Sequence, residues 1–302
     1  MVTQPTRLDS FSATNAARAL TLACAGAELD ATDARLVRLG ENAIYELPHE
    51  RIVVRIARSE ALADRVRREL DVARWLATQD FPAARVAEPL AQPRLVDGRL
   101  VTFWEQIISE PGDEATFEDL AATLRRLHSL PPPPFTLPAF DPFSVVPTRL
   151  AEASEVGRTD VTFLMHLYES LRETYVNLTF PTPFGLIHGD AHRGNLLCVG
   201  GKPILLDFEV VAHGPREWDL TSTAMSVDRF GVSPLSYESF ASTYGMDVMA
   251  WSGYHVLREI RELTMTTWLM QIVGEGPQYA DEFRLRVDSL REGDHACRWH
   301  PF

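Results

Sequence analysis

The chain has 302 residues, of which 45% are hydrophobic and 24% charged, which is typical of a globular protein with sizeable cores. Its 42 acidic and 29 basic residues give a formal net charge of -13, which argues against nucleic acid and anionic membranes as partners and favours cationic substrates. Solubility alone also explains such a charge. Neither a signal peptide nor a membrane-spanning apolar run is visible, so we expect a cytoplasmic protein. The three cysteines are scattered without a C-x-x-C pattern, as in reduced thiols.

The first predicted elements are strands. Residues 38–50 indicate two strands around a bend with a single glycine, Gly40, so a G-x-G-x-x-G phosphate loop is absent. Residues 51–57, RIVVRIA, predict a third strand. Because successive side chains in a strand point to opposite faces, Val53 and Arg55 share one face and the isoleucines share the other.

An amphipathic helix is predicted after this strand, over residues 59–79. Glu69 falls on its apolar stripe. A carboxylate on an inward face needs a partner, because an unpaired buried charge costs several kcal/mol. Arg55 is the natural partner, and the alternative is a pair with Arg65 or Arg68 at the edge of the helix.

Two further elements follow before the most informative segment. Residues 101–107, VTFWEQI, predict a strand that could either connect two lobes or belong to a core. Residues 117–130 have helical periodicity, and the run Pro131 to Pro134 ends that helix in a surface connector.

A hairpin is predicted by the runs LLCV (196–199) and PILL (203–206), which a Gly-Gly pair separates. If Val199 pairs with Lys202, Asn195 lies opposite Leu206 and diagonal to Asp207. Diagonal neighbours across a ladder are roughly 7–8 Å apart, which is close enough for an amide oxygen and a carboxylate to converge on one cation. The sequence therefore predicts a metal site formed by Asn195 and Asp207.

The spacing around this hairpin indicates phosphoryl transfer. Hard cations such as Mg²⁺ take oxygen ligands, and the upstream Asp190 is free to orient an attacking hydroxyl and accept its proton. His188, Asp190 and Asn195 form H-x-D-x-x-x-x-N, and D-F follows twelve residues after the Asn, which is the pattern of kinases. His188 either orients this loop or is an ordinary half-buried histidine. The alternatives for the whole motif are a set of turn residues and a two-metal phosphoesterase, whose additional clustered ligands are missing.

With Gly189 after the His and Glu209 in place of the last Gly of D-F-G, the strings HGDAHRGN and LLDFE resemble the aminoglycoside phosphotransferase family. The resemblance extends from about residue 38 to 273. It implies an α+β, two-lobed protein-kinase-like fold with a nucleotide-binding lobe (1–103), a hinge (104–109) and a mainly helical lobe (110–302) that carries the hairpin and binds the acceptor. It also implies transfer of the γ-phosphate of ATP, or of GTP, to a hydroxyl of a small molecule.

The resemblance assigns further roles. Arg55, oriented by Glu69, would hold the α- and β-phosphates, although most kinases have Lys there and Arg is not its equivalent. Choline kinases are similar in this V-x-R-I variant. The nucleotide would be surrounded by four residues that contact it through backbone or apolar groups, namely Val53, Asn42, Glu105 and Ile107.

The acceptor is less defined. Aminoglycosides are the cationic class of acceptor that the family suggests, and amino alcohols or sugars are the alternative acceptors. A nucleotide-binding pseudokinase, which transfers no phosphate, is the alternative from a different class of function. In the helix predicted over 254–273, Glu259 and Glu262 could bind amines or form a solvated face with Arg258 and Arg261. By resemblance, Asp219 caps the next helix and braces the catalytic loop, or is a simple N-cap.

Overall fold

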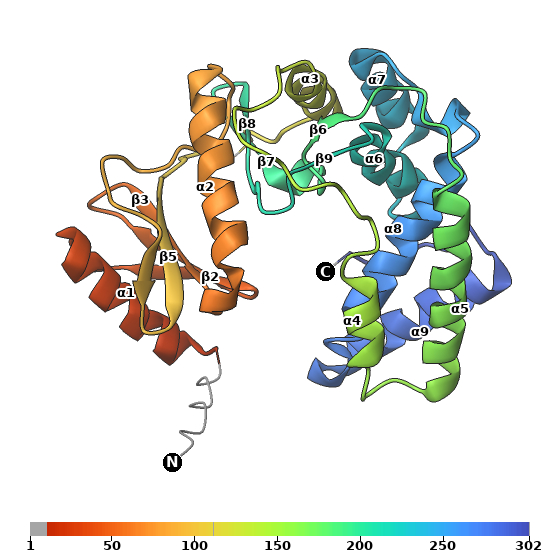
Figure 1. The fold of residues 1–302 in the computed structure, drawn as a ribbon, viewed down its shortest axis with the longest axis horizontal. Coiled ribbons are helices and arrows are strands. Elements are labelled where there is room, and N and C mark those ends of the chain that lie inside the picture. Colours follow the sequence, from red (N-terminus) through yellow and green to blue (C-terminus); the bar gives the residue numbers. More distant parts are fainter. Residues whose placement is uncertain (1–10, 111, 302) are drawn as a thin grey trace. The chain divides into compact units, whose positions relative to one another are not determined.

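A computed structural model describes residues 11–110 and 112–301 of the chain. The chain forms two compact units (Figure 1). Unit 1 comprises Met1–Glu114 and Leu196–Val210, and unit 2 comprises Ala115–Asn195 and Val211–Phe302. Within the described ranges, no helix combines the length and the apolar character needed to cross a membrane. The functional lobe boundaries expected from the sequence remain a prediction.

Unit 1 is built on a five-stranded antiparallel sheet. In spatial order its strands are β1 (Arg35–Leu39), β2 (Asn42–Leu47), β3 (Ile52–Ala57), β5 (Arg99–Glu105) and β4 (Arg94–Val96). The expected pair of strands around a bend is present as β1 and β2, whose turn is closed by a 3.0 Å hydrogen bond from Gly40 N to Asn42 O. The central strand β3 pairs with β2 and β5, so its backbone is held on both sides.

The two faces of this sheet are covered by different helices. The helix α1 (Ala13–Ala27) packs on the face that carries Val54 and Ile56, both fully buried. On the opposite face lies α2 (Ala63–Thr78), which follows the short helix η1 (Glu60–Leu62). The alternation predicted for β3 is therefore confirmed, and Arg55 faces α2.

The hairpin of β7 (Leu196–Val199) and β8 (Lys202–Leu205) belongs to unit 1. Val199 pairs with Lys202, which confirms the predicted register. Both turn glycines have positive φ, 54° at Gly200 and 74° at Gly201, and this is the conformation that glycine adopts without steric cost. Hydrogen bonds of 2.9 Å from Leu205 N to Pro82 O and from Ala84 N to Leu205 O fix the hairpin to the loop that follows the helix ending at Thr78.

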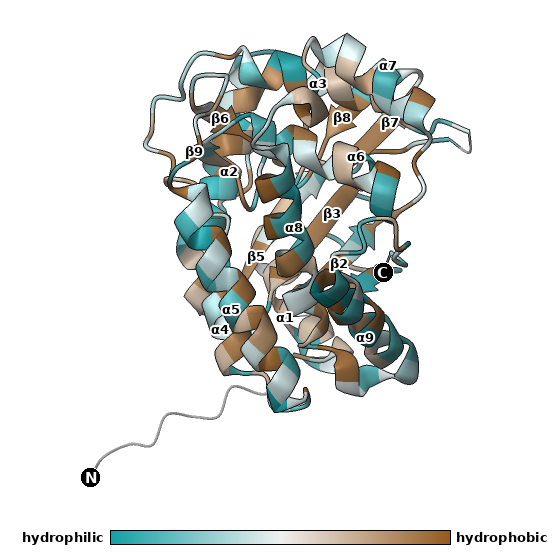
Figure 2. Ribbon diagram, turned by 90° about the vertical axis from the view of Figure 1, so that its right-hand side faces the viewer, coloured by the Kyte–Doolittle hydropathy of each residue, from teal (hydrophilic) through white to brown (hydrophobic). Residues whose placement is uncertain are grey.

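Unit 2 is mainly helical. Its elements are α3 (Phe117–His128), α4 (Val146–Ala151), α5 (Arg158–Tyr175), β6 (Gly185–Ile187), η2 (Arg193–Asn195), β9 (Ala212–Gly214), α6 (Glu217–Arg229), α7 (Pro234–Tyr244), η3 (Val248–Ala250), α8 (Tyr254–Leu269), η4 (Val273–Glu275) and α9 (Pro277–Glu292). Apolar faces of α4, α5, α8 and α9 meet in one core. Figure 2 shows these helices with both hydrophilic and hydrophobic faces, whereas β3 and β5 of unit 1 are hydrophobic along most of their length. The short β6–β9 pair carries the chain to the loop that holds Asp190.

Candidate active site

The loop that presents Asp190 begins where β6 ends. Gly189 has a φ of 86°, which lets the backbone turn sharply directly before Asp190. The ring of His188 is fully buried, and its Nδ1 accepts a 3.3 Å hydrogen bond from Asp190 N. Of the two interpretations of His188, the structure therefore favours the one in which its ring orients the loop. The Asp190 side chain itself is 53% exposed.

Asp219 supports the same loop from the protein interior. Its completely buried carboxylate accepts hydrogen bonds from His188 N (2.6 Å) and Gly189 N (2.8 Å), and His128 Nε2 lies 3.0 Å from it. Burial opposes ionisation, but the interaction with His128 outweighs it and lowers the pKa of Asp219. The predicted brace is confirmed. The predicted helix cap is wrong, because Arg216 is the N-cap of α6 and the Asp219 carboxylate is committed to the loop.

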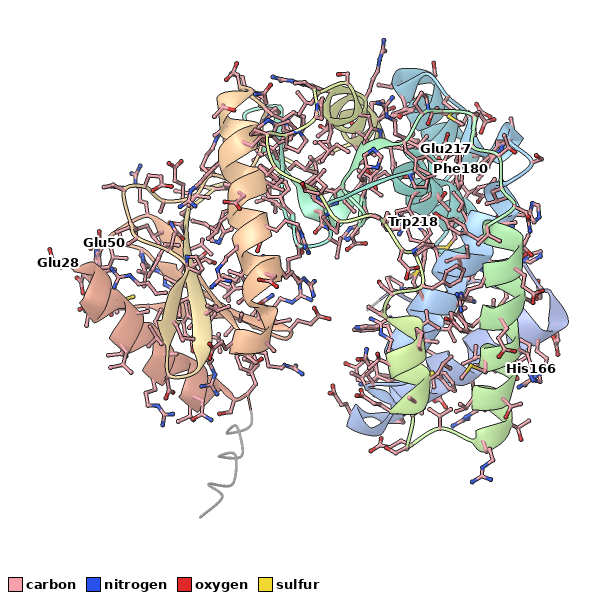
Figure 3. All side chains as sticks on the ribbon, viewed as in Figure 1. Glu28, Glu50, His166, Phe180, Glu217 and Trp218 are labelled. Atoms are coloured by element: carbon pink, nitrogen blue, oxygen red, sulfur yellow. The ribbon has the colours of Figure 1, made fainter. Side chains whose placement is uncertain are left out.

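Trp218 and Arg261 complete the support. Trp218 Nε1 donates a 2.7 Å hydrogen bond to Gly189 O (Figure 3 labels Trp218 at the start of α6). The guanidinium of Arg261 stacks 4.2 Å from the centre of the Trp218 ring, and Nη2 donates to Trp218 O at 2.9 Å. Arg261 is buried, so the solvated face that the sequence suggested for it is wrong. Burial lowers the pKa of Arg261, while Asp190 and Asp219 act in the opposite direction.

Asp190 is ionised at neutral pH. Surrounding protein atoms raise its pKa by desolvation, but His192, whose Nε2 lies 3.6 Å from Asp190 Oδ2, and the charge of Arg261 bring the pKa well below its usual range. A carboxylate with such a low pKa is a weak base but a constant hydrogen-bond acceptor. The geometry therefore suits the orientation of a hydroxyl group.

Asn195 is fixed to the same loop. Its Nδ2 donates a 3.0 Å hydrogen bond to Asp190 O, and its backbone N donates to His192 O at 3.0 Å. The bond from Nδ2 decides which end of the amide faces the protein. It leaves the amide oxygen as the group that could coordinate a cation.

In unit 1, the predicted contact between Arg55 and Glu69 is present. Arg55 Nη1 lies 2.6 Å from Glu69 Oε1, and the two side chains are 17% and 4% exposed. Burial raises the pKa of Glu69 to about 7, with Asp207 raising it further and Arg55 opposing the shift. The alternative partners Arg65 and Arg68 instead contact Glu209.

Glu209 is the functional candidate that the sequence reasoning missed. Asn42 Nδ2 donates to its Oε1 at 2.8 Å, Arg55 Nη2 forms an ion pair with the same oxygen, and Arg65 Nη2 forms one with Oε2. The backbone oxygen of Glu209 accepts from Arg68 Nη2 at 3.5 Å. The only signal in the sequence is that an acidic residue stands where D-F-G has glycine.

Asp207 lies beside Glu209 in a strained backbone conformation. Its φ is 58°, which is unusual for a residue other than glycine, and its Oδ1 accepts from Glu209 N at 3.4 Å. Oxygens of Glu69, Asp207 and Glu209 lie within 4.8 Å of one another. Such an all-oxygen set could hold a hard divalent cation, but Arg55 and Arg65 already neutralise two of its three carboxylates, those of Glu69 and Glu209.

The residues expected around the nucleotide base lie on β3 and at the end of β5. Val53 is partly buried and is opposite Trp104 in the ladder. Glu105 N donates to Arg85 O at 2.9 Å, so this amide is not available to a ligand, which would have to bind the carbonyl group. Ile107 N makes no hydrogen bond to any residue that the structure describes. A carbonyl acceptor and an amide donor two residues apart can bind the edge of a purine.

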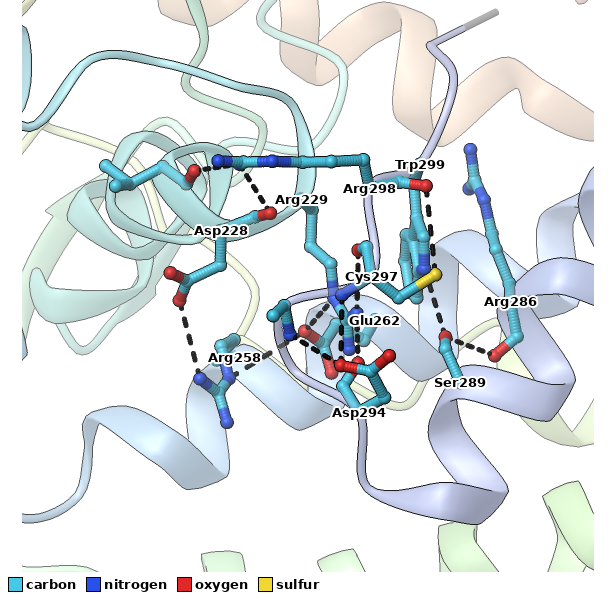
Figure 4. Close-up of polar contacts among 12 residues, drawn as sticks. Asp228, Arg229, Arg258, Glu262, Arg286, Ser289, Asp294, Cys297, Arg298 and Trp299 are labelled. Atoms are coloured by element: carbon cyan, nitrogen blue, oxygen red, sulfur yellow. Dashed lines mark hydrogen bonds and ion pairs between the residues drawn. The ribbon is translucent and has the colours of Figure 1, made fainter.

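Glu262 differs from both interpretations of the helix over 254–273. It is completely buried in α8, where its Oε1 accepts a 2.7 Å hydrogen bond from the equally buried Arg229 Nε. Arg258 Nε lies 3.7 Å from the same oxygen, and Figure 4 shows how these groups meet. Glu262 is thus part of a buried ion pair and not of a solvated face. Glu259 is half-buried.

An exposed ionised aspartate on a braced glycine loop and a fixed amide oxygen in unit 2, and a buried Arg–Glu pair in unit 1, are each features that a kinase-like phosphotransferase requires. A model of the phosphotransferase enzyme family (APH) matches residues 33–260, and the chain belongs to this family. The predicted family and enzyme class are therefore confirmed, and the protein is a small-molecule phosphotransferase. A search of functionally curated proteins found no match.

Solved structures show the same fold. The amicoumacin kinase hAmiN, in complex with AMP-PNP, Ca²⁺ and Ami, is 16% identical, with a TM-score of 0.68 over 88% of this chain and 90% of that one. A microcompartment-associated aminopropanol kinase is 20% identical, with a TM-score of 0.64 over 88% and 94% of the two chains. The aminoglycoside phosphotransferase APH(3'')-Id from Streptomyces rimosus is 21% identical, with a TM-score of 0.59 over 81% and 97%. The predicted protein-kinase-like α+β fold is confirmed.

Proposed function

We propose that this enzyme transfers the γ-phosphate of ATP, with Mg²⁺ as cofactor, to a hydroxyl group of a small cationic molecule. The observation that carries the proposal is Asp190, a half-exposed and ionised carboxylate on a loop whose backbone is held by the buried Asp219. A solvent-accessible hydrogen-bond acceptor in such a rigid setting positions a hydroxyl for in-line attack.

The steps follow from the residues. Asp190 accepts a hydrogen bond from the acceptor hydroxyl, whose oxygen attacks the γ-phosphorus while the bond to the departing diphosphate breaks. The proton leaves the hydroxyl only once the new bond has largely formed, when even the weak base Asp190 can accept it. Asn195 and Asp207 would hold the Mg²⁺, which when bound neutralises charge on the β- and γ-phosphates. Arg55, oriented by Glu69, binds the phosphate chain.

For the donor, Glu105 O and Ile107 N bind the base, Val53 covers it, and Asn42 lies at the turn that faces the phosphates. ATP is proposed because the related amicoumacin kinase is described with AMP-PNP and Ca²⁺. Another structural relative, at 16% identity, is described with GDP and kanamycin, so GTP is the alternative donor to be tested beside ATP.

For the acceptor, the net charge of -13 supports a cationic molecule through electrostatic steering. An aminoglycoside-like acceptor is our first candidate, and its phosphorylation would confer antibiotic resistance. The similarity to an aminopropanol kinase and to a choline kinase favours an amino alcohol as the second candidate. In both classes the acceptor combines a hydroxyl with a positive charge.

The test is a screen for acceptor-dependent nucleotide hydrolysis or transfer with aminoglycosides, amino alcohols and neutral sugars, each with ATP and GTP. Product phosphorylation is verified by mass spectrometry, and Asp190→Asn serves as the inactive control. We expect at least one cationic acceptor to be phosphorylated by the wild type and a loss of turnover of about 10²- to 10⁴-fold in Asp190→Asn. Nucleotide binding without transfer to any acceptor would instead support a pseudokinase.

A further inference from the structure

Glu209 has the contacts of a bound anion. Its carboxylate is held by two guanidinium groups and one amide, which come from β2, β3 and α2. Arg55 is consequently shared between two carboxylates, with Nη1 on Glu69 and Nη2 on Glu209. Both terminal nitrogens of this side chain are therefore engaged before any nucleotide arrives.

This arrangement conflicts with phosphate binding by Arg55. A triphosphate that approached Arg55 would meet the Glu209 carboxylate at Nη2. It would also meet the carboxylates of Glu69 and Asp207, because oxygens of these two residues and of Glu209 lie within 4.8 Å of one another. Like charges at this distance repel strongly when partly buried. Arg55 can bind phosphate well only after the Glu209 carboxylate has moved away from it.

Arg65 is placed to receive that carboxylate. Its Nη2 already pairs with Glu209 Oε2, the oxygen that Arg55 does not contact. Its Nε is buried and has no hydrogen-bond partner among the residues that the structure describes. Arg65 therefore has a second donor with which it can bind both oxygens of Glu209 as a bidentate pair.

We propose that Glu209 competes with the nucleotide phosphates for Arg55, and that Arg65 takes over Glu209 when a nucleotide binds. This inference rests on the proposed function, because it concerns the phosphate-binding residue of that site. Glu209 then sets the affinity for the phosphate donor, and Arg65 is a positioning residue that acts through Glu209 and not by touching phosphate.

The first test is the binding of inorganic tripolyphosphate and of ATP to the full chain by calorimetry, with divalent cations removed by a chelator. Glu209→Gln keeps the size of the side chain and its acceptor for Asn42 but removes the charge. We expect it to tighten metal-free binding by about tenfold. Glu60→Gln is the matched control, because Glu60 is exposed in η1 and the substitution changes the net charge equally. It should change binding by less than about twofold.

The second test separates Arg65 from direct phosphate binding. Arg65→Gln should weaken tripolyphosphate binding by at least about threefold in the wild type, because Glu209 then stays on Arg55, and it should have no effect when Glu209 is already Gln. Equal weakening in both backgrounds would mean that Arg65 binds phosphate itself, which overturns the proposal. So would the absence of tripolyphosphate binding by every variant.

A role of Glu209 as a metal ligand gives the opposite pattern. Glu209→Gln would then leave metal-free binding unchanged and weaken the binding of Mg²⁺-ATP, and this result also overturns the proposal. Because these measurements need no acceptor, their failure is distinguishable from a failure of the proposed transfer, which is tested by acceptor phosphorylation and Asp190→Asn.

Discussion

Replacement of Glu69 by Gln should change how the stability of unit 1 depends on pH. The Glu69 side chain is 4% exposed, and burial raises its pKa from 4.5 to about 7. Between these two pH values the folded chain binds more protons at Glu69 than the unfolded chain does. The free energy of unfolding therefore decreases as pH rises through this window, and the decrease is complete above the folded pKa.

The size of the effect follows from the difference between the two pKa values. A difference of about 2.5, from 7 minus 4.5, corresponds to about 3 kcal/mol at about 1.4 kcal/mol for each unit of pKa. Glu69→Gln cannot titrate, yet its amide oxygen can still accept from Arg55 Nη1. The variant should thus gain about 3 kcal/mol relative to the wild type between pH 4.5 and pH 7.5.

Hydrogen exchange of peptides from β3 and β5, corrected for the intrinsic exchange rates at each pH, measures the opening free energy of unit 1. The comparison of variant with wild type cancels the titrating groups that do not interact with Glu69. Glu60→Gln, in the exposed first turn of η1, is the control and should follow the wild type. If the difference between Glu69→Gln and the wild type is the same at pH 4.5 and pH 7.5, Glu69 does not titrate in this range and the reasoning is refuted.

The remaining predictions concern separate parts of the site. Asp207→Ala should weaken the binding of Mg²⁺-nucleotide by more than about tenfold in calorimetry while metal-free binding does not weaken, and unchanged Mg²⁺-nucleotide affinity would remove Asp207 from the metal site. Asp219→Asn should lower the free energy of unfolding by about 2–4 kcal/mol in urea, because an amide cannot accept from two backbone N–H groups and His128 together; a loss under about 0.5 kcal/mol would contradict the brace. Arg55→Ala and Glu69→Ala should show a coupling of about 0.5–3 kcal/mol in nucleotide affinity, and strict additivity would mean that their contact has no role in binding.

Local periodicity was sufficient for the parts of the structure that depend on neighbouring residues. The two-residue Gly-Gly turn determines the hairpin register, so the pairing of Val199 with Lys202 followed from the sequence. The period of two in β3 and the period of 3.6 in α2 placed Arg55 and Glu69 on inward faces, where each needs the other. Such patterns show which face of an element is buried.

They do not show which distant group a buried charge will meet. Glu262 has arginines nearby on its own helix, which favoured a local pair, but its partner at 2.7 Å is Arg229 of α6, 33 residues away. Asp219 lies near the start of a helix, which favoured a cap, but tertiary packing brings two loop amides to its carboxylate. In both cases the shortest contact is with a buried tertiary partner, and for Glu262 the local Arg258 lies farther away, at 3.7 Å. A desolvated charge gains more from a fixed buried donor than from a mobile exposed one.

Glu209 is the extreme case of this limit. Its hydrogen bond with Asn42 spans 167 residues, and its ion pairs connect it to β3 and α2, so no window of sequence contains the set. The motif shows only that an acidic residue replaces a glycine. A glycine has no side chain that could form an ion pair with Arg55. The replacement therefore adds a negative charge that pairs with Arg55 Nη2, and under our proposal this charge must move before a phosphate donor binds there.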